Sequence, residues 1–132
     1  MFKLLYKFGF RDIKKHVLKP VIPLDKIFIE DPVRMLRAIK YSAKTGSKMS
    51  FVLRHKIRTS ANLLSQVSPS RLTEELLKII NSGHAADIVS EALDTDLYMA
   101  LQPAATAIMY DNRKFEMSYM KNMQALDEFI AQ

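Results

Sequence analysis

Apolar residues recur at intervals of three and four along most of this chain, which is the spacing that places side chains on one face of an α-helix. The segment 31–44 shows this pattern clearly. We expect Asp31 to cap this helix and Pro32 to lie in its first turn, where the missing N–H of proline costs nothing. The buried stripe of the helix is then expected to consist of Val33, Leu36, Ile39 and Ala43.

Two further helices are predicted from their start signals. Ser50 and Ser68-Pro69 are typical of helix N-termini, because a serine hydroxyl accepts a hydrogen bond from the backbone of the first turn. Gly83 follows the second of these helices and is the residue type expected just past a helix end. The residues expected to be buried are Leu53, Ile57, Ala61 and Leu64 in the first helix and Leu72, Leu76 and Ile79 in the second.

The two ends of the chain show weaker patterns. Beyond Gly83 we expect helical segments over 85–93, around 97–101 and over 113–130, with an interruption at Pro103. The stretch 16–23 contains two prolines and several β-branched residues, which favours a short strand or an extended arm. With only three glycines in 132 residues, the pattern predicts an all-α fold with a short extended N-terminal segment.

The composition excludes several classes of protein. A hydrophobic fraction of 48% is enough for a modest core, so the chain is not a disordered tail. There is no cysteine, so neither a disulfide framework nor a thiolate metal site can form. No apolar run approaches the roughly 20 residues of a membrane span, and residues 1–8 do not form a secretory signal. We therefore expect a cytoplasmic protein with no membrane partner.

Charge is distributed unevenly along the sequence. Residues 1–60 contain ten Lys and five Arg against four acidic residues, whereas residues 61–132 contain five basic and ten acidic residues. A basic half joined to an acidic half suggests that one face meets a polyanion, and nucleic acid is the commonest intracellular one. A solvated helical surface would show the same charge pattern, so this signal alone is not specific.

The string Glu30-Asp31-Pro32-Val33-Arg34-Met35-Leu36-Arg37 is the sharpest local signal. Asp31 and Arg34 lie about one helical turn apart. A carboxylate accepts and a guanidinium donates, so together they can pair with a base edge that presents a donor beside an acceptor, as adenine and cytosine do. Uracil and guanine present the opposite order and would leave polar groups unpaired. The alternative interpretation is a helix cap and a local ion pair.

Four segments of the sequence resemble one family, the bacterial poly(A) polymerases and the related tRNA CCA-adding enzymes. The segment 30–44 is similar to the family's nucleotide-selecting motif and neck helix over its whole length. The segments 9–19, 64–78 and 82–84 follow the family's order and spacing. The resemblance covers about half of the chain and implies three regions: residues 1–29 as the end of a nucleotidyltransferase head, 30–83 as neck helices with an RNA-binding region, and 84–132 as the start of a helical body.

The resemblance also implies roles for individual residues. Asp31 and Arg34 would read the base of the incoming nucleotide, and Glu30 and Arg37 would brace that pair. Support from the neighbouring helix would come from two further residues, Arg71 and Glu74. The residues expected to contact RNA phosphates are Lys40, Lys44, Arg54, Lys56 and Arg58, because cations on adjacent helices can follow an RNA backbone without reading its sequence.

The catalytic part of such an enzyme is not recognisable in this sequence. The family's head carries a Gly-Ser loop followed by a carboxylate pair that holds two metal ions, and it should precede residue 9. Gly46-Ser47 has no carboxylate pair close behind it, and Asp94-Thr95-Asp96 has no Gly-Ser before it. The residues His16, His55 and His84 are too scattered for a metal site. We therefore predict no catalytic residue, no metal ligand and no cofactor in this chain, with ATP and Mg²⁺ implied for the intact enzyme.

Two hypotheses about function follow. In the first, the chain is a truncated product or one piece of a split poly(A) polymerase whose intact form adds AMP from ATP to RNA 3′ ends, and it pairs with a separate catalytic head. Within this hypothesis a CCA-adding enzyme is the alternative, since adenine and cytosine look alike to Asp31 and Arg34. In the second, the chain is a stand-alone helical module that binds RNA or a protein. The expected partner is RNA, either an mRNA 3′ end or a tRNA, and an exposed helical face allows self-association.

Overall fold

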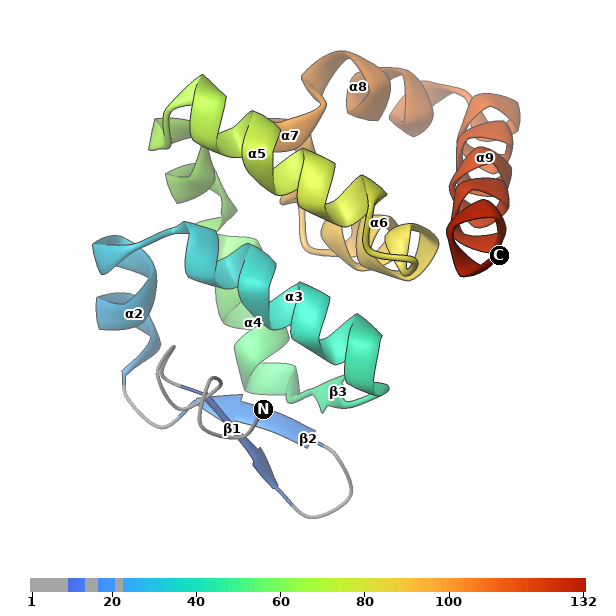
Figure 1. Cartoon of the computed structure of the whole chain (residues 1–132). Coiled ribbons are helices and arrows are strands. Elements are labelled where there is room, and N and C mark those ends of the chain that lie inside the picture. The colour runs from blue at the N-terminus through green and yellow to red at the C-terminus, as the bar shows by residue number, and fades with distance from the viewer. Residues whose placement is uncertain (1–9, 14–16, 21–22) are drawn as a thin grey trace. The chain divides into compact units, whose positions relative to one another are not determined.

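The structure is a computed structural model that describes residues 10–13, 17–20 and 23–132, and the chain forms two units, Met1–Val67 and Ser68–Gln132 (Figure 1). Helices dominate both units, which confirms the predicted all-α class. The three functional regions inferred from the resemblance, with boundaries after residues 29 and 83, stay a prediction, because compactness alone does not test them.

The first unit begins with a small three-stranded sheet. Strand β1 (Phe10–Ile13) pairs antiparallel with β2 (Val17–Pro20), and β2 pairs in parallel with the two-residue strand β3 (Lys48–Met49). Strand β2 confirms the extended segment predicted within 16–23. His16 and the start of the segment 9–19 at Gly9 lie outside the described residues.

Helix α2 (Leu24–Glu30) was not predicted, and it follows Pro23 directly. It is only seven residues long, so the helical period cannot be read from it reliably. Its formation depends on packing, because Ile27 and Phe28 are both fully buried. This short helix places Glu30 and Asp31 at the start of the next helix.

Helix α3 (Val33–Thr45) has most of the predicted apolar stripe, with Val33, Leu36 and Ile39 fully buried and Ala43 only half-buried. It begins at Val33 rather than at Pro32, although Pro32 already has helical dihedral angles. Gly46 closes the helix in the left-handed conformation, with φ of 72°, which a residue with a Cβ atom adopts only with strain.

Helix α4 (Phe51–Ser60) is capped as predicted, since the Ser50 hydroxyl accepts the Leu53 N–H at 3.2 Å. The chain then tightens into the 3₁₀-helix η1 (Ala61–Gln66), whereas a continuous α-helix was expected. The side chains expected to be buried still are, because Ala61 and Leu64 face the core of the unit. Leu53 and Ile57 complete that core from α4.

The second unit contains five helices, α5 (Pro69–Ile80), α6 (Ala85–Asp94), α7 (Tyr98–Leu101), α8 (Pro103–Asp111) and α9 (Arg113–Ala131). The Ser68 hydroxyl accepts the Arg71 N–H at 3.4 Å, which confirms the predicted start of α5. Pro103 interrupts the helical pattern as expected, and it does so by starting α8. The core of the unit includes Ile79, Ile88, Ala92, Leu97, Tyr98 and Met109.

Two side chains of α5 are less buried than predicted. Leu72 and Leu76 are half-buried, and only Ile79 of the predicted stripe is fully buried. None of the described helices combines the length and the apolar character that crossing a membrane would require.

Candidate nucleic-acid interface

The predicted nucleotide-selecting motif lies where α2 meets α3. Asp31 is extended, with φ of −150° and ψ of 96°, and it separates the two helices. One of its carboxylate oxygens accepts the Val33 N–H at 3.3 Å. Asp31 therefore bonds the first residue of α3 from the position before the N-cap, which is Pro32, whereas Asp31 itself was predicted to be the cap.

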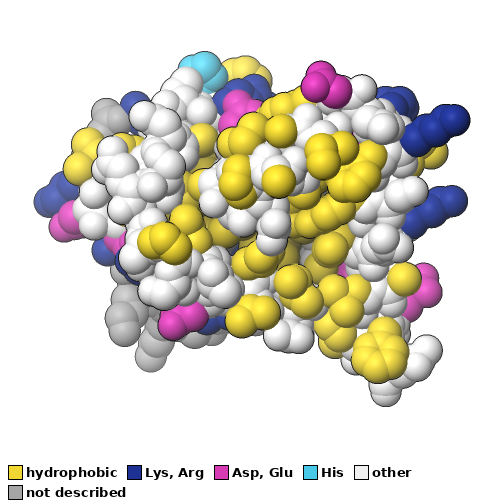
Figure 2. Space-filling view, turned by 90° about the horizontal axis from the view of Figure 1, so that it is seen from above, with side chains coloured by type: hydrophobic (Ala, Val, Ile, Leu, Met, Phe, Trp, Pro, Cys, Tyr) yellow, Lys and Arg dark blue, Asp and Glu magenta, His cyan; other side chains and the backbone are white. Residues whose placement is uncertain are grey.

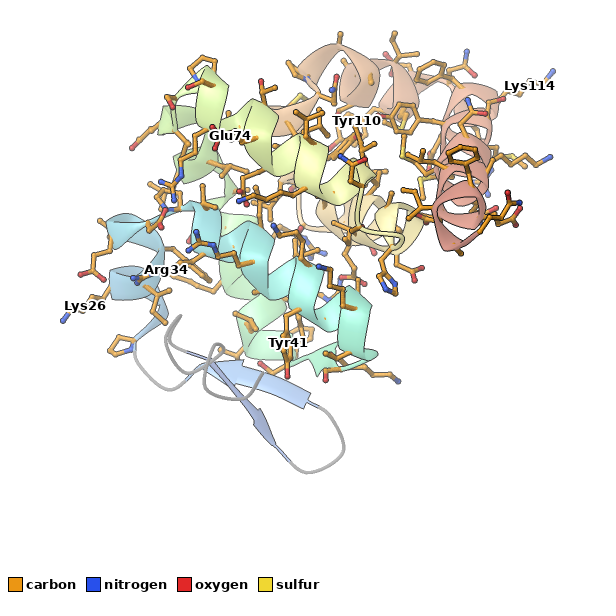
Figure 3. The ribbon with its side chains drawn as sticks, in the orientation of Figure 1. Lys26, Arg34, Tyr41, Glu74, Tyr110 and Lys114 are labelled. Atoms are coloured by element: carbon orange, nitrogen blue, oxygen red, sulfur yellow. The ribbon has the colours of Figure 1, made fainter. Side chains whose placement is uncertain are left out.

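Two ion pairs form at this junction. Arg34 Nη1 lies 3.1 Å from Glu30 Oε2, and Arg37 Nη1 lies 3.8 Å from Asp31 Oδ2. Each residue predicted to read a base is thus in contact with one of the residues predicted to brace it. Asp31 and Arg34 are held by separate partners, and the Arg34 backbone N–H donates to the Asp31 carbonyl at 3.0 Å, so both residues lie at the start of α3, where Figure 3 labels Arg34.

The ion pair with Glu30 does not satisfy every hydrogen-bond donor of the Arg34 guanidinium. Its side chain is 22% exposed, and its Nε atom is buried without a hydrogen-bond partner among the described residues. A buried donor with no acceptor is destabilising, and such atoms are rare in native proteins. An acceptor supplied by a bound ligand would relieve this cost.

Arg71 and Glu74, which were predicted from the resemblance to support the motif, lie in the second unit. Arg71 is half-buried in the first turn of α5, and Glu74 is exposed one turn later (Figure 3). Their support of Asp31 and Arg34 stays a prediction. Sequence reasoning missed the neighbouring Glu75, which is 3% exposed and pairs with Lys78 at 3.0 Å. The spacing of three residues was the available signal for that pair.

The candidate phosphate contacts lie in the first unit, which is strongly basic. From Pro32 to Val67 the sequence holds eight Lys and Arg residues and no acidic residue. Lys44 and Arg58 are exposed, and the remaining predicted contacts, Lys40, Arg54 and Lys56, are half-buried. The structure adds Lys48, which is exposed on β3 and was not singled out from the sequence.

Asp96 and Ser47 belong to the two sequence motifs that could suggest catalysis, and in the structure both lie in connecting segments and form hydrogen bonds. Asp96 has a positive φ of 65° and accepts a hydrogen bond from Tyr110 at 3.3 Å, and burial followed by the Asp96 charge raises the pKa of Tyr110 (Figure 3). Ser47 is buried in the turn after α3, where its hydroxyl accepts from Thr45 at 2.9 Å. In the part of the chain that the structure describes, no three His, Asp or Glu side chains form a group able to hold a metal ion.

The chain matches one family model and several known proteins. Residues 48–109 match the family model described as the probable RNA and SrmB-binding site of polymerase A. Poly(A) polymerase I of Escherichia coli O157:H7 is 33% identical over 107 residues, which cover 81% of this chain and 23% of that protein. The CCA-adding enzyme of Lactobacillus helveticus is 29% identical over 89 residues, covering 67% of this chain and 22% of that enzyme.

These matches define the chain first as an RNA-binding helical segment. It belongs to the family of bacterial poly(A) polymerases and CCA-adding enzymes. The chain spans less than a quarter of the length of these relatives, at 23% and 22%. The matched residues 48–109 contain Arg54, Lys56 and Arg58, whereas the motif at 30–37 precedes them.

Proposed function

We propose that this chain is the RNA-binding and nucleotide-selecting part of a poly(A) polymerase-like nucleotidyltransferase, whose intact form adds AMP from ATP to RNA 3′ ends. The observation that supports this most directly is the presence of two ion pairs at the α2–α3 junction. Through them Arg37 contacts the Asp31 carboxylate, which is an acceptor, and Glu30 contacts the Arg34 guanidinium, which is a donor group, at the start of a segment rich in positive charge.

Base selection follows from the order of donors and acceptors. The amino group of adenine would donate to the Asp31 carboxylate, and the adjacent ring nitrogen would accept from the Arg34 guanidinium. Uracil and guanine would instead place an acceptor against the carboxylate and a donor against the guanidinium. An unmet polar group in a partly buried site costs about 1–3 kcal/mol, which is enough for useful selectivity.

Adenine addition is favoured over CCA addition by sequence similarity. The segments 32–37 and 68–72 look more like the polymerase branch than the CCA-adding branch. Poly(A) polymerase I relatives are also 31–33% identical to the chain, compared with 27–29% for the CCA-adding enzymes. The base edge itself does not distinguish the two, because cytosine presents the same order of groups.

This proposal assigns described residues to the base of ATP and none to Mg²⁺. Asp31 and Arg34 fit the base of ATP, whereas the described residues provide no carboxylate cluster for a metal ion. In this proposal a catalytic head, as implied by the resemblance, would supply the chemistry of transfer, and RNA would be held by the cations of α3 and α4. The RNA partner in this proposal is an mRNA 3′ end or a tRNA.

The test is a chimera in which this chain replaces the matching segment of Escherichia coli poly(A) polymerase I. The incorporation of each of the four nucleotides into an RNA primer is then measured. Arg34→Ala should lower the preference for ATP by about tenfold, which corresponds to about 1.4 kcal/mol, while primer binding changes little. Lys26→Ala is the matched control, because Lys26 is an exposed cation on α2 outside the motif (Figure 3).

A second candidate function is an RNA-binding module without nucleotide selection. It is favoured by the family match, which covers residues 48–109 and leaves out Asp31 and Arg34. If the chimera with Arg34→Ala keeps the nucleotide preference of the unaltered chimera, nucleotide selection is wrong. RNA binding by the purified chain, measured with oligo(A) and tRNA at low and moderate salt, would then support the module.

A further inference from the structure

Helix α4 exposes an aromatic ring on the side opposite its buried face. Phe51 is 84% exposed, the largest value among the exposed large hydrophobic residues of the described structure. Leu53 and Ile57 point into the core of the unit from the other side of the same helix. Single exposed apolar residues are common on proteins, so the meaning of Phe51 depends on its neighbours.

The neighbours of Phe51 on this face are His55 and Arg58. They follow Phe51 by four and seven residues, which places all three along one side of the helix, and both are exposed. Each of the three side chains ends in a flat group, either an aromatic ring or a guanidinium plane. Flat groups of these kinds stack on nucleobases.

The surroundings of this face are basic. Lys44, at the end of α3, and Lys48, on β3, are exposed just before α4 in the sequence. The segment from Pro32 to Val67 has no acidic residue to repel a phosphate backbone. A stacking surface among cations is the combination by which proteins bind single-stranded nucleic acid.

We propose that Phe51, His55 and Arg58 form a stacking platform for the bases of single-stranded RNA. The proposal rests on the proposed RNA-binding function and adds base contacts to the phosphate contacts. Positions four apart on a helix are separated by about 6 Å along its axis. This is close to twice the roughly 3.4 Å spacing of stacked bases, so the Phe51 and His55 positions leave room for one base between their rings.

The first experiment compares Phe51→Ala with the unaltered chain by fluorescence polarisation of labelled oligo(A). Loss of one stacking contact should weaken binding by roughly 5- to 100-fold. Phe51→Trp should retain binding, because indole also stacks. Val52→Ala is the matched control, since Val52 is the next residue on α4 and is 66% exposed. Thermal melts of each variant establish that its helices still form.

Two further measurements separate stacking from charge. An abasic oligonucleotide of the same length should bind the Phe51→Ala variant and the unaltered chain equally, because it has no bases to stack. In a salt titration, Phe51→Ala should leave the slope of log Kd against log salt unchanged. Lys44→Ala, which removes an exposed cation outside the platform, should lower the magnitude of that slope by about one, as expected for a lost phosphate contact.

Failure of this proposal is distinguishable from failure of RNA binding itself. If Phe51→Ala binds oligo(A) as tightly as the unaltered chain while Lys44→Ala binds more weakly, RNA binding stands and the stacking platform is wrong. If the unaltered chain binds no RNA at low salt, both the platform and the RNA-binding function are wrong.

Discussion

Asp127 in α9 accepts the backbone N–H of Ala85, the first residue of α6, at 2.7 Å across a sequence separation of 42 residues. The other carboxylate oxygen of Asp127 accepts the Ala86 N–H at 2.9 Å. His84 occupies the N-cap position of α6, and histidine is not a strong capping residue. The carboxylate therefore satisfies two donors that the helix leaves open and interacts favourably with the positive end of its dipole.

Asp127→Ala should lower the free energy of unfolding by about 1–2 kcal/mol, because two backbone donors lose a charged acceptor. Urea unfolding followed by circular dichroism measures this change. Glu128→Ala is the control, since Glu128 is an exposed acid at the next position of α9. Equal stabilities of the two variants would show that Asp127 does not anchor the start of α6.

A second prediction concerns high pH. The Tyr98 and Tyr119 hydroxyls are hydrogen-bonded, and their rings meet edge to face with centroids 6.0 Å apart. Burial, with the Tyr119 hydrogen bond second, raises the pKa of Tyr98. The folded chain therefore favours neutral Tyr98, whereas the unfolded chain ionises it near its ordinary pKa of about 10. Stability should be fully present below about pH 10 and should fall as the pH rises further.

The measurement is the free energy of unfolding from urea titrations at increasing alkaline pH. Tyr98→Phe is the informative variant because it removes the ionisable group and keeps the ring. It should be less stable near neutral pH, where the hydrogen bond is lost, and its stability should decline less steeply above about pH 10. A decline as steep as that of the unaltered chain would place the cause in other groups.

Local signals predicted a large part of the fold. The caps at Ser50 and Ser68 were readable because a capping bond joins residues only three apart. The cap at Asp127 was not readable, because its partners are 42 and 41 residues away. Helix α2 was missed for a related reason: its seven residues form a helix chiefly through burial of Ile27 and Phe28, and not through a readable period.

For the candidate site, the sequence named the residues but not their exposure. Glu30 contacts Arg34 and Arg37 contacts Asp31, while the bracing and base-reading roles implied by the resemblance stay predictions. The exposure of Phe51 was not predictable, since an apolar residue at a helix start is as compatible with a core as with a surface. Only the position of the buried face of α4 shows which side of the helix meets solvent.

Glu30→Gln tests whether the bracing contact matters for selection. The Glu30 side chain is 57% exposed, so its loss should change stability by less than about 0.5 kcal/mol. It should nevertheless reduce the preference of the poly(A) polymerase chimera for ATP, because Arg34 loses the ion pair that orients it. Nucleotide incorporation by the chimera measures this effect.

The control for Glu30→Gln is Asp111→Asn, which removes an exposed acid at the end of α8. It should alter neither stability nor nucleotide preference. A Glu30→Gln chimera with an unchanged preference for ATP would show that Arg34 needs no bracing by Glu30.

The last prediction concerns α9, all of whose residues are described and none of whose side chains is buried. One face of this helix presents an open surface formed by Arg113, Glu116, Met117, Met120, Lys121 and Gln124. Other hydrophobic side chains are also exposed in the second unit, including those of Ile108, Tyr110 and Phe129. Figure 2 shows hydrophobic side chains gathered over the helices that lie uppermost in Figure 1.

The charged and apolar side chains on this face of α9 are complementary to those on the same face of a second copy. In an antiparallel pair of α9 helices centred between Ser118 and Tyr119, Glu116 would face Lys121 of a second copy. Met117 would then face Met120, and acid would meet base on both sides of the methionines. We propose that the chain self-associates through this face, as expected for an isologous interface between identical surfaces.

Light scattering after size-exclusion chromatography should therefore show a molecular mass that rises with concentration. Met120→Lys should give a monomer, because it would place a charge in the apolar centre of the pair. Met99→Lys is the control, since Met99 is a 38% exposed methionine on α7. High salt should weaken the association by screening the Glu116 and Lys121 contacts. A monomer at every concentration would show instead that this face does not pair with a second copy.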